Sequence, residues 1–243
     1  MIAGFMAGVR TQLRLSALTP LSVFSSMLSP ITYGIVAISS GIPIDVGITL
    51  GIAAAGIWGA TLSSSVIAVL QERQGRTLQL LATTPSALVW PLFGRVVGAA
   101  IQSTVAAPLS VLAVSVIWRP PRLGNPALAA GSLLLVILGS TAMSAFFVGF
   151  LVRYRFFAGM INGFEDLTAL LCGMFVPVAT LAPIGRGVAW MLPPTWGMIT
   201  VRDQSFTALA VGTLVVLCWF VLATICLISA ERRVRRTPSA FFV

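Results

Sequence analysis

Few residues in this chain could carry out acid–base, nucleophilic or metal chemistry. The chain has no histidine, which removes the commonest general base and metal ligand. Its three cysteines, Cys172, Cys218 and Cys226, lie inside apolar runs without metal-ligand spacing, so we interpret them as small apolar residues and not as disulfide partners. No G-x-x-x-x-G-K-[ST] phosphate loop occurs in the sequence. We therefore expect neither an enzyme nor a metal site, with no catalytic residue and no cofactor on this chain.

The adjacent carboxylates Glu165 and Asp166 are the one acidic pair inside a long apolar stretch. Because a carboxylate is costly to bury in lipid, such residues face a partner or a wet cavity. In a secondary transporter they could bind the coupled proton, so a proton-coupled transporter is the alternative function that this pair supports. The pair lies near the start of its stretch, which makes an ion pair with Arg153 or Arg155 the simpler interpretation.

Composition identifies the elements that would position these residues. The chain is 58% hydrophobic and only 9% charged, whereas a soluble domain carries roughly 25% charged residues. A soluble protein with a very apolar core is the alternative, but its surface would be poorly solvated. Six apolar stretches are each near the ~20 residues that a membrane-spanning helix needs. We predict a single-domain, all-α integral membrane protein with six transmembrane helices, over Leu21–Ser40, Val46–Leu70, Leu92–Trp118, Ala127–Val152, Gly159–Ala179 and Phe206–Ile228.

The arginines predict the orientation of these helices. The net charge is +9, and every basic residue is an arginine because the chain has no lysine. An excess of arginine marks the cytoplasmic side of a membrane protein. Four arginines, Arg119, Arg122, Arg186 and Arg202, fall on the other side. With six spans both termini are then cytoplasmic, and no nucleic-acid partner is expected. The all-arginine basicity indicates a GC-rich bacterial genome, and we expect a multi-pass protein of the bacterial inner membrane. The eleven arginines on the cytoplasmic side are Arg10, Arg14, Arg73, Arg76, Arg95, Arg153, Arg155, Arg232, Arg233, Arg235 and Arg236.

Residues 1–18 are expected to form an amphipathic helix that lies in the membrane interface and does not cross the bilayer. Arg10 and Arg14 fall on its polar face, where they could steady the helix or contact lipid phosphates. A signal peptide is disfavoured because no small-x-small cleavage site follows. The apolar face consists of Ile2, Phe5, Met6, Val9 and Leu13.

The external segment 180–205 is apolar but interrupted by Pro183, Pro193 and Pro194. Its apolar part is too short to cross a bilayer as a helix. We expect a re-entrant helical segment that dips into the outer leaflet before the last span, with Trp190 and Trp196 at the interface. The Gly47/Gly51 and Gly94/Gly98 spacings indicate close helix packing.

The cytoplasmic segment 71–91 has the most informative pattern. A short helix is expected to start at Thr77 and stop before Pro85, with Leu78 and Leu81 on one face. Such an apolar ridge could dock into a groove on a soluble partner. The alternative is a helix that rests on the lipid surface.

This segment resembles a known family signature. The run from Gln71 to Pro85 is similar to the Glu-Arg-x-x-Gly-Thr-Leu-x-x-Leu-x-x-x-Pro motif of the type-2 permeases of ATP-binding cassette (ABC) exporters, with Arg76 as an extra residue. The run from Cys172 to Arg202 is similar to the Ser-Gly-x-x-Phe-Pro…Pro…Leu-Pro…Arg pattern of the same family, with Cys172 in place of serine. The expected topology matches this family over essentially the whole chain.

The resemblance implies that this chain is a permease subunit that exports a drug, an antibiotic or a lipid-like molecule. A separate ABC ATPase subunit would bind ATP and Mg, and a second permease, identical or homologous, would complete the transport unit. The resemblance further assigns the coupling contact with the ATPase to Glu72, Arg73, Gly75, Arg76, Thr77, Leu78, Leu81, Thr84 and Pro85.

The resemblance also implies a substrate path bordered by the first, second and fifth spans. Methionine, aromatic and hydroxyl side chains suit amphipathic ligands. Ordinary helix packing is the alternative role for each of these residues. The candidates are Phe24, Met27, Thr61, Ser64, Asn162, Met174 and Phe175.

Overall fold

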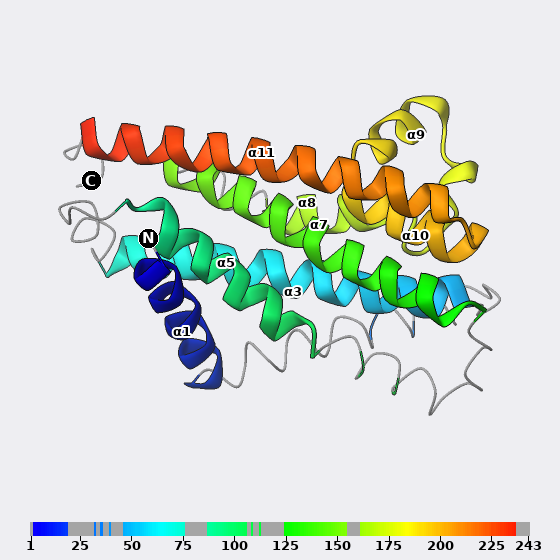
Figure 1. Ribbon diagram of the computed structural model, residues 1–243, viewed down its shortest axis with the longest axis horizontal. Helices are drawn as coiled ribbons and strands as arrows, with labels where there is room; N and C mark the ends of the chain where they lie inside the picture. The colour runs from blue at the N-terminus through cyan, green and yellow to red at the C-terminus, as the bar shows by residue number, and fades with distance from the viewer. Residues whose placement is uncertain are drawn as a thin grey trace.

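The computed structural model describes residues 2–18, 46–75, 87–105, 124–154 and 161–236, together with residues 32, 35, 39, 108 and 112. These ranges contain eight α-helices, one short 3-10 helix and no strand, so the described chain is all-helical as predicted (Figure 1). The helices are α1 (Ile2–Leu18), α3 (Val46–Gln74), α5 (Val89–Ser103), α7 (Pro126–Arg153), α8 (Ile161–Leu171), α9 (Pro183–Trp190), α10 (Pro193–Asp203) and α11 (Phe206–Arg236), with η2 (Val178–Thr180) before α9.

Three helices, α3, α7 and α11, are long and apolar enough to cross a membrane. They confirm three of the predicted long apolar helices, which is compatible with a membrane protein. Helix α7 lies between α3 and α11 and contacts both. Most of the apolar stretch of α3 and α7 is covered by other helices, whereas most of that of α11 is exposed.

The other three predicted spans are described only in part. The first, 21–40, lies almost wholly outside the described residues, and the third is described as α5 up to Ser103. Within the fifth, 159–179, helix α8 ends at Leu171 after 11 described residues. Gly173 then adopts a left-handed φ of 75° and breaks the helix, a conformation that glycine accepts without steric cost. The chain therefore turns in the middle of a stretch that composition predicts as one continuous helix.

Helix α1 packs against the first part of α5 through small residues. A Cβ added to Gly8 would meet the Pro91 carbonyl, and one added to Gly94 would meet the Phe5 carbonyl, so the two backbones touch. Further along the pair, Ser16 donates a hydrogen bond to Gln102. The Gly94/Gly98 spacing thus does mark a close helix contact.

The long helices share one direction. Helices α3, α7 and α11 end, and α5 begins, at a single end of the bundle, where α1 also starts (Figure 1). We call this the arginine end, because its helix termini carry Arg73, Arg95, Arg153, Arg232, Arg233, Arg235 and Arg236. The opposite end contains the start of α7, where the Asn125 side chain accepts a hydrogen bond from the Ala127 amide and Pro126 occupies the first helical turn.

Candidate functional site

The described residues on both sides of the predicted coupling segment lie at the arginine end. Helix α3 closes with Gly75, whose amide bonds the Gln71 carbonyl, and α5 begins at Val89. Glu72, Arg73 and Gly75 are described; the remaining predicted coupling residues, Arg76, Thr77, Leu78, Leu81, Thr84 and Pro85, lie outside the described residues.

An ion pair joins the two helices that border this segment. The Arg95 guanidinium of α5 lies 2.6 Å from a Glu72 carboxylate oxygen of α3, and both side chains are largely buried. Removing one partner would leave the other charge buried and uncompensated, which is costly. The pair therefore fixes the end of α3 against α5.

Arg73 attaches the same end of α3 to α7. Its Nη2 donates hydrogen bonds to the Leu151 carbonyl (2.6 Å) and the Val152 carbonyl (2.8 Å), the last turn of α7. A helix C-terminus leaves carbonyls without intrahelical partners and carries partial negative charge, so a guanidinium satisfies it well. Neighbouring residues of α3 thus hold two different helices.

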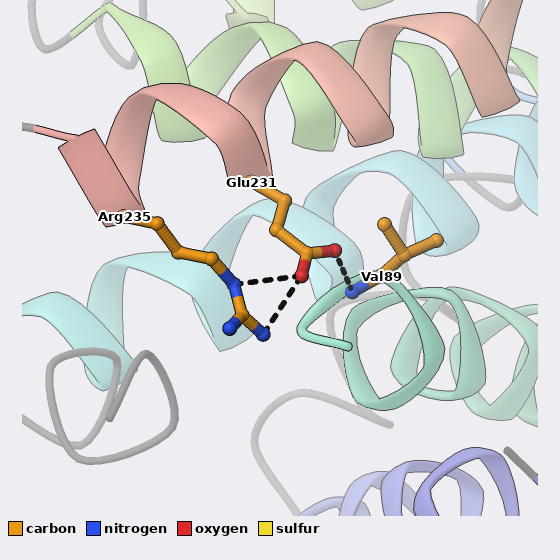
Figure 2. Close-up of polar contacts among 3 residues, drawn as sticks. All are labelled: Val89, Glu231 and Arg235. Carbon is orange, nitrogen blue, oxygen red and sulfur yellow. Dashed lines mark hydrogen bonds and ion pairs between the residues drawn. The ribbon is translucent and has the colours of Figure 1, made fainter. Parts of the chain in front are cut away.

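Glu231 makes a third connection, from α11 to α5. One oxygen of its carboxylate accepts a hydrogen bond from the Val89 amide at 3.3 Å, at the first turn of α5 (Figure 2). The other oxygen pairs with Arg235 one helical turn away, with an Arg235 nitrogen 2.9 Å from it. A carboxylate at a helix N-terminus satisfies a free amide and complements the helix dipole.

These contacts join the end of α3 to α7 through Arg73, and to α5 through Glu72 and Arg95. Arg95 and Glu231 were not predicted from the sequence as members of this site. For Glu231 the signal was its position as the one carboxylate in a run of four arginines; for Arg95 no local signal exists.

Glu165 lies against the middle of α3. Its carboxylate accepts a hydrogen bond from the Ser63 hydroxyl at 2.9 Å, and a Cβ added to Gly59 would strike it. Gly59 is about 20 Å along α3 from Val46, at 1.5 Å of rise per residue. No ion pair joins Glu165 to Arg153 among the described residues, and Arg155 lies outside them.

Thus the described contacts of Glu165 differ from the expected ion pair at the cytoplasmic end. The difference arises because α8 packs alongside α3, and the Trp58 indole donates a hydrogen bond to the Glu165 carbonyl at 3.2 Å. Asp166 is exposed, so the two acidic residues occupy different surroundings.

The candidate path residues do not gather around one described cavity. Thr61 is fully buried and shares a 2.7 Å hydrogen bond with Ser103, so it joins α3 to α5. Met174 is fully buried where Gly51 of α3 meets its carbonyl, and Phe175 packs on the same core. Ser64 is half-buried. The side chain of Asn162, and Phe24 and Met27 entirely, lie outside the described residues.

The segment before α11 contacts the long helices well inside the bundle. The Trp219 indole of α11 donates a hydrogen bond to the Met191 carbonyl at 2.7 Å, and a Cβ added to Gly139 of α7 would meet Pro193. Trp219 and Gly139 each lie about 20 Å from the start of their helix, at 1.5 Å per residue. A cavity of about 240 Å³ follows, lined by Pro177, Val178, Ala179, Arg186, Trp190, Met198, Ile199, Arg202 and Asp203.

Helix α1 presents Arg10 and Arg14 on its exposed side. The exposed apolar residues Ile2, Met6 and Leu13 lie beside them, whereas Gly8 is buried against α5. The exposed surface therefore combines an apolar stripe with two cations.

Comparison of the sequence with protein-family models and with curated proteins finds no match.

Proposed function

We propose that this chain is the transmembrane permease subunit of an ATP-driven ABC exporter. It moves a hydrophobic or amphipathic molecule, such as a drug, an antibiotic or a lipid-like compound, out of the cell. The observation that carries the proposal is the set of buried contacts at the borders of segment 71–91, where Glu72, Arg73 and Arg95 tie the segment to α5 and α7.

The proposed mechanism needs force to pass from a soluble subunit into the membrane helices. A separate ATPase binds ATP and Mg and contacts the apolar ridge of Leu78 and Leu81. Closure of the ATPase displaces residues 76–86. The Glu72–Arg95 ion pair carries that displacement to α5, and the hydrogen bonds of Arg73 carry it to the end of α7. A second permease, identical or homologous, forms the other half of the transport unit, and the cavity between the two opens alternately to either side.

The distribution of arginine supports a cytoplasmic position for segment 71–91. The arginine end holds seven described helix-terminal arginines, whereas Arg186 and Arg202 lie in the segment before α11. By the rule that arginine-rich loops stay inside, the arginine end faces the cytoplasm of a bacterial inner membrane, with both termini on that side.

The segment 180–205 is proposed to be re-entrant from the external side. What supports this is the depth of Met191 and Pro193, about 20 Å along α11 and α7 by helical rise. A segment that contacts both long helices this far from their starts would suit a helical hairpin that enters the bundle and returns to the same side. The exposed stripe of α1 beside Arg10 and Arg14 similarly supports a helix at the lipid interface.

A proton-coupled secondary transporter is the second candidate, because Glu165 lies at the mid-length of α3. An ionisable residue at that depth is a functional site by default. Glu165 also accepts a hydrogen bond from Ser63 and lies close to Gly59, so it has a structural role. Under the first candidate function, the ABC exporter, that structural role is its only one.

Co-purification tests the proposed function. The tagged chain, extracted in mild detergent, is expected to retain an ATPase with a phosphate-binding loop, identified by mass spectrometry. Leu78→Asp should remove the ATPase and abolish ATP hydrolysis by the complex while leaving expression intact. The control is Gln79→Asp, which adds the same charge beside the apolar face. Equal ATPase recovery with Leu78→Asp would refute the coupling assignment.

A further inference from the structure

A basic cavity of about 690 Å³ opens between α7 and α11 at the arginine end. Its lining residues differ from the coupling contacts, which join the end of α3 to α5 and to the last turn of α7. It is lined by Arg153, Ile225, Ile228, Ser229, Arg232, Arg233 and Arg236.

The charged residues that line this cavity come from two helices, α7 and α11. The guanidinium of Arg153 lies 5.3 Å, and that of Arg233 5.7 Å, from the centre of the same Tyr154 ring. The Tyr154 ring thus contacts one guanidinium from each helix. The neighbouring carboxylate of Glu231 is engaged with Val89 and Arg235 (Figure 2). Four arginines line the cavity, so its charge suits an anionic ligand.

The apolar part of the cavity lining belongs to α11, and an apolar surface continues from it along that helix. Ile225 and Ile228 line it, with exposed fractions of 59% and 39%. Closer to the start of α11, the exposed residues Leu214, Leu217 and Val221 continue the same face at helical spacing. From Leu214 to Ile228 this stripe is about 21 Å long at 1.5 Å per residue, the scale of a lipid acyl chain.

We propose that this cavity binds an anionic phospholipid of the membrane leaflet on the arginine side. The phosphate contacts Arg153, Arg232 and Arg233, and one acyl chain lies along Ile228 and Ile225 of α11. Basic pockets between membrane helices bind anionic headgroups, and the apolar stripe selects a lipid over a free phosphate. The site requires only that α11 spans a membrane and is independent of the proposed ATPase partner.

Native mass spectrometry of the full chain in detergent tests this site, with phosphatidylglycerol as the probe and phosphatidylcholine with the same acyl chains as the reference. The wild-type protein should retain phosphatidylglycerol preferentially, and high salt should weaken that preference. Arg153→Gln and Arg232→Gln should each lower the affinity for phosphatidylglycerol about fivefold. Phosphatidylcholine binding should stay unchanged.

The matched control is Arg235→Gln, which removes the same charge from the same part of α11 but outside the cavity. It should keep the wild-type preference. Equal loss in Arg235→Gln and Arg232→Gln would contradict a localised site, as would a wild-type protein without lipid preference. If glycerol phosphate at equal concentration displaced the lipid, the ligand of the cavity would be a soluble phosphate and the lipid proposal would be wrong.

Discussion

Glu72 and Arg95 form a buried ion pair, 2.6 Å between oxygen and nitrogen, that joins the end of α3 to α5 across the borders of segment 76–86. Arg73, the next residue, holds the end of α7. Adjacent side chains at the end of α3 therefore hold two different helices, and the proposed coupling role relies on this arrangement.

Glu72→Gln is expected to destabilise the protein, because Arg95 would keep its charge without a buried partner. Loss of one member of a buried pair costs about 3–5 kcal/mol. The free energy of unfolding in detergent measures this, with Asp203→Asn, at an exposed acidic residue, as the control. The reversed pair, Glu72→Arg with Arg95→Glu, should recover part of the loss. Wild-type stability in Glu72→Gln would show that the pair contributes little.

Gly94→Ala should loosen the contact between α1 and α5. The added Cβ would meet the Phe5 carbonyl, a backbone atom that cannot rotate away, and overpacking of this kind costs about 1–3 kcal/mol. Faster hydrogen exchange in residues 2–18 is the expected readout. Gly163→Ala is the control, since nothing lies within 4 Å of its added Cβ. Unchanged exchange in Gly94→Ala would argue against the close crossing.

Trp219→Phe removes the indole N–H that bonds the Met191 carbonyl. The ring contact with Phe146 can persist, so the expected loss is that of a single hydrogen bond, about 1 kcal/mol. Hydrogen exchange in residues 183–203 should accelerate. Trp190→Phe serves as the control, because that side chain is 50% exposed. The same acceleration in both variants would mean that the Trp219 bond does not hold the segment.

Glu165→Gln separates the two candidate functions. Glutamine can still accept the Ser63 hydrogen bond and carries no charge at the mid-length of α3, so the protein should be at least as stable as the wild type. Under the ABC exporter proposal the variant complex should hydrolyse ATP at the wild-type rate. Asp166→Asn controls for loss of a carboxylate at an exposed position. Transport that needs no ATP and stops on Glu165→Gln would favour proton coupling.

The sequence predicted the long helices because their signal is local. Val46–Leu70, Ala127–Val152 and Phe206–Ile228 are apolar runs with arginine near the end, and each is found as a long helix. The turn after α8 was not predicted, since the left-handed φ of Gly173 leaves no trace in an apolar stretch of this length.

The candidate site was predicted less completely. The Glu72, Arg73 and Gly75 positions follow from a linear motif, but the Arg73 acceptors are backbone carbonyls, which have no sequence signature. The partners Arg95 and Glu231 depend on which helices pack together, and hydrophobic periodicity does not specify this. Likewise, the position of Glu165 beside the middle of α3 follows from the packing of α8 against Ser63 and Gly59.

Site-specific photocrosslinking tests the proposed contact between segment 71–91 and a separate ATPase. A photoreactive amino acid replaces Leu78 in the tagged full chain, and a second version carries it at Leu217, an exposed position of α11. We expect a crosslinked product containing a phosphate-loop ATPase from position 78 and none from position 217. Efficient crosslinking of position 78 to lipid alone, with no ATPase product, would contradict it.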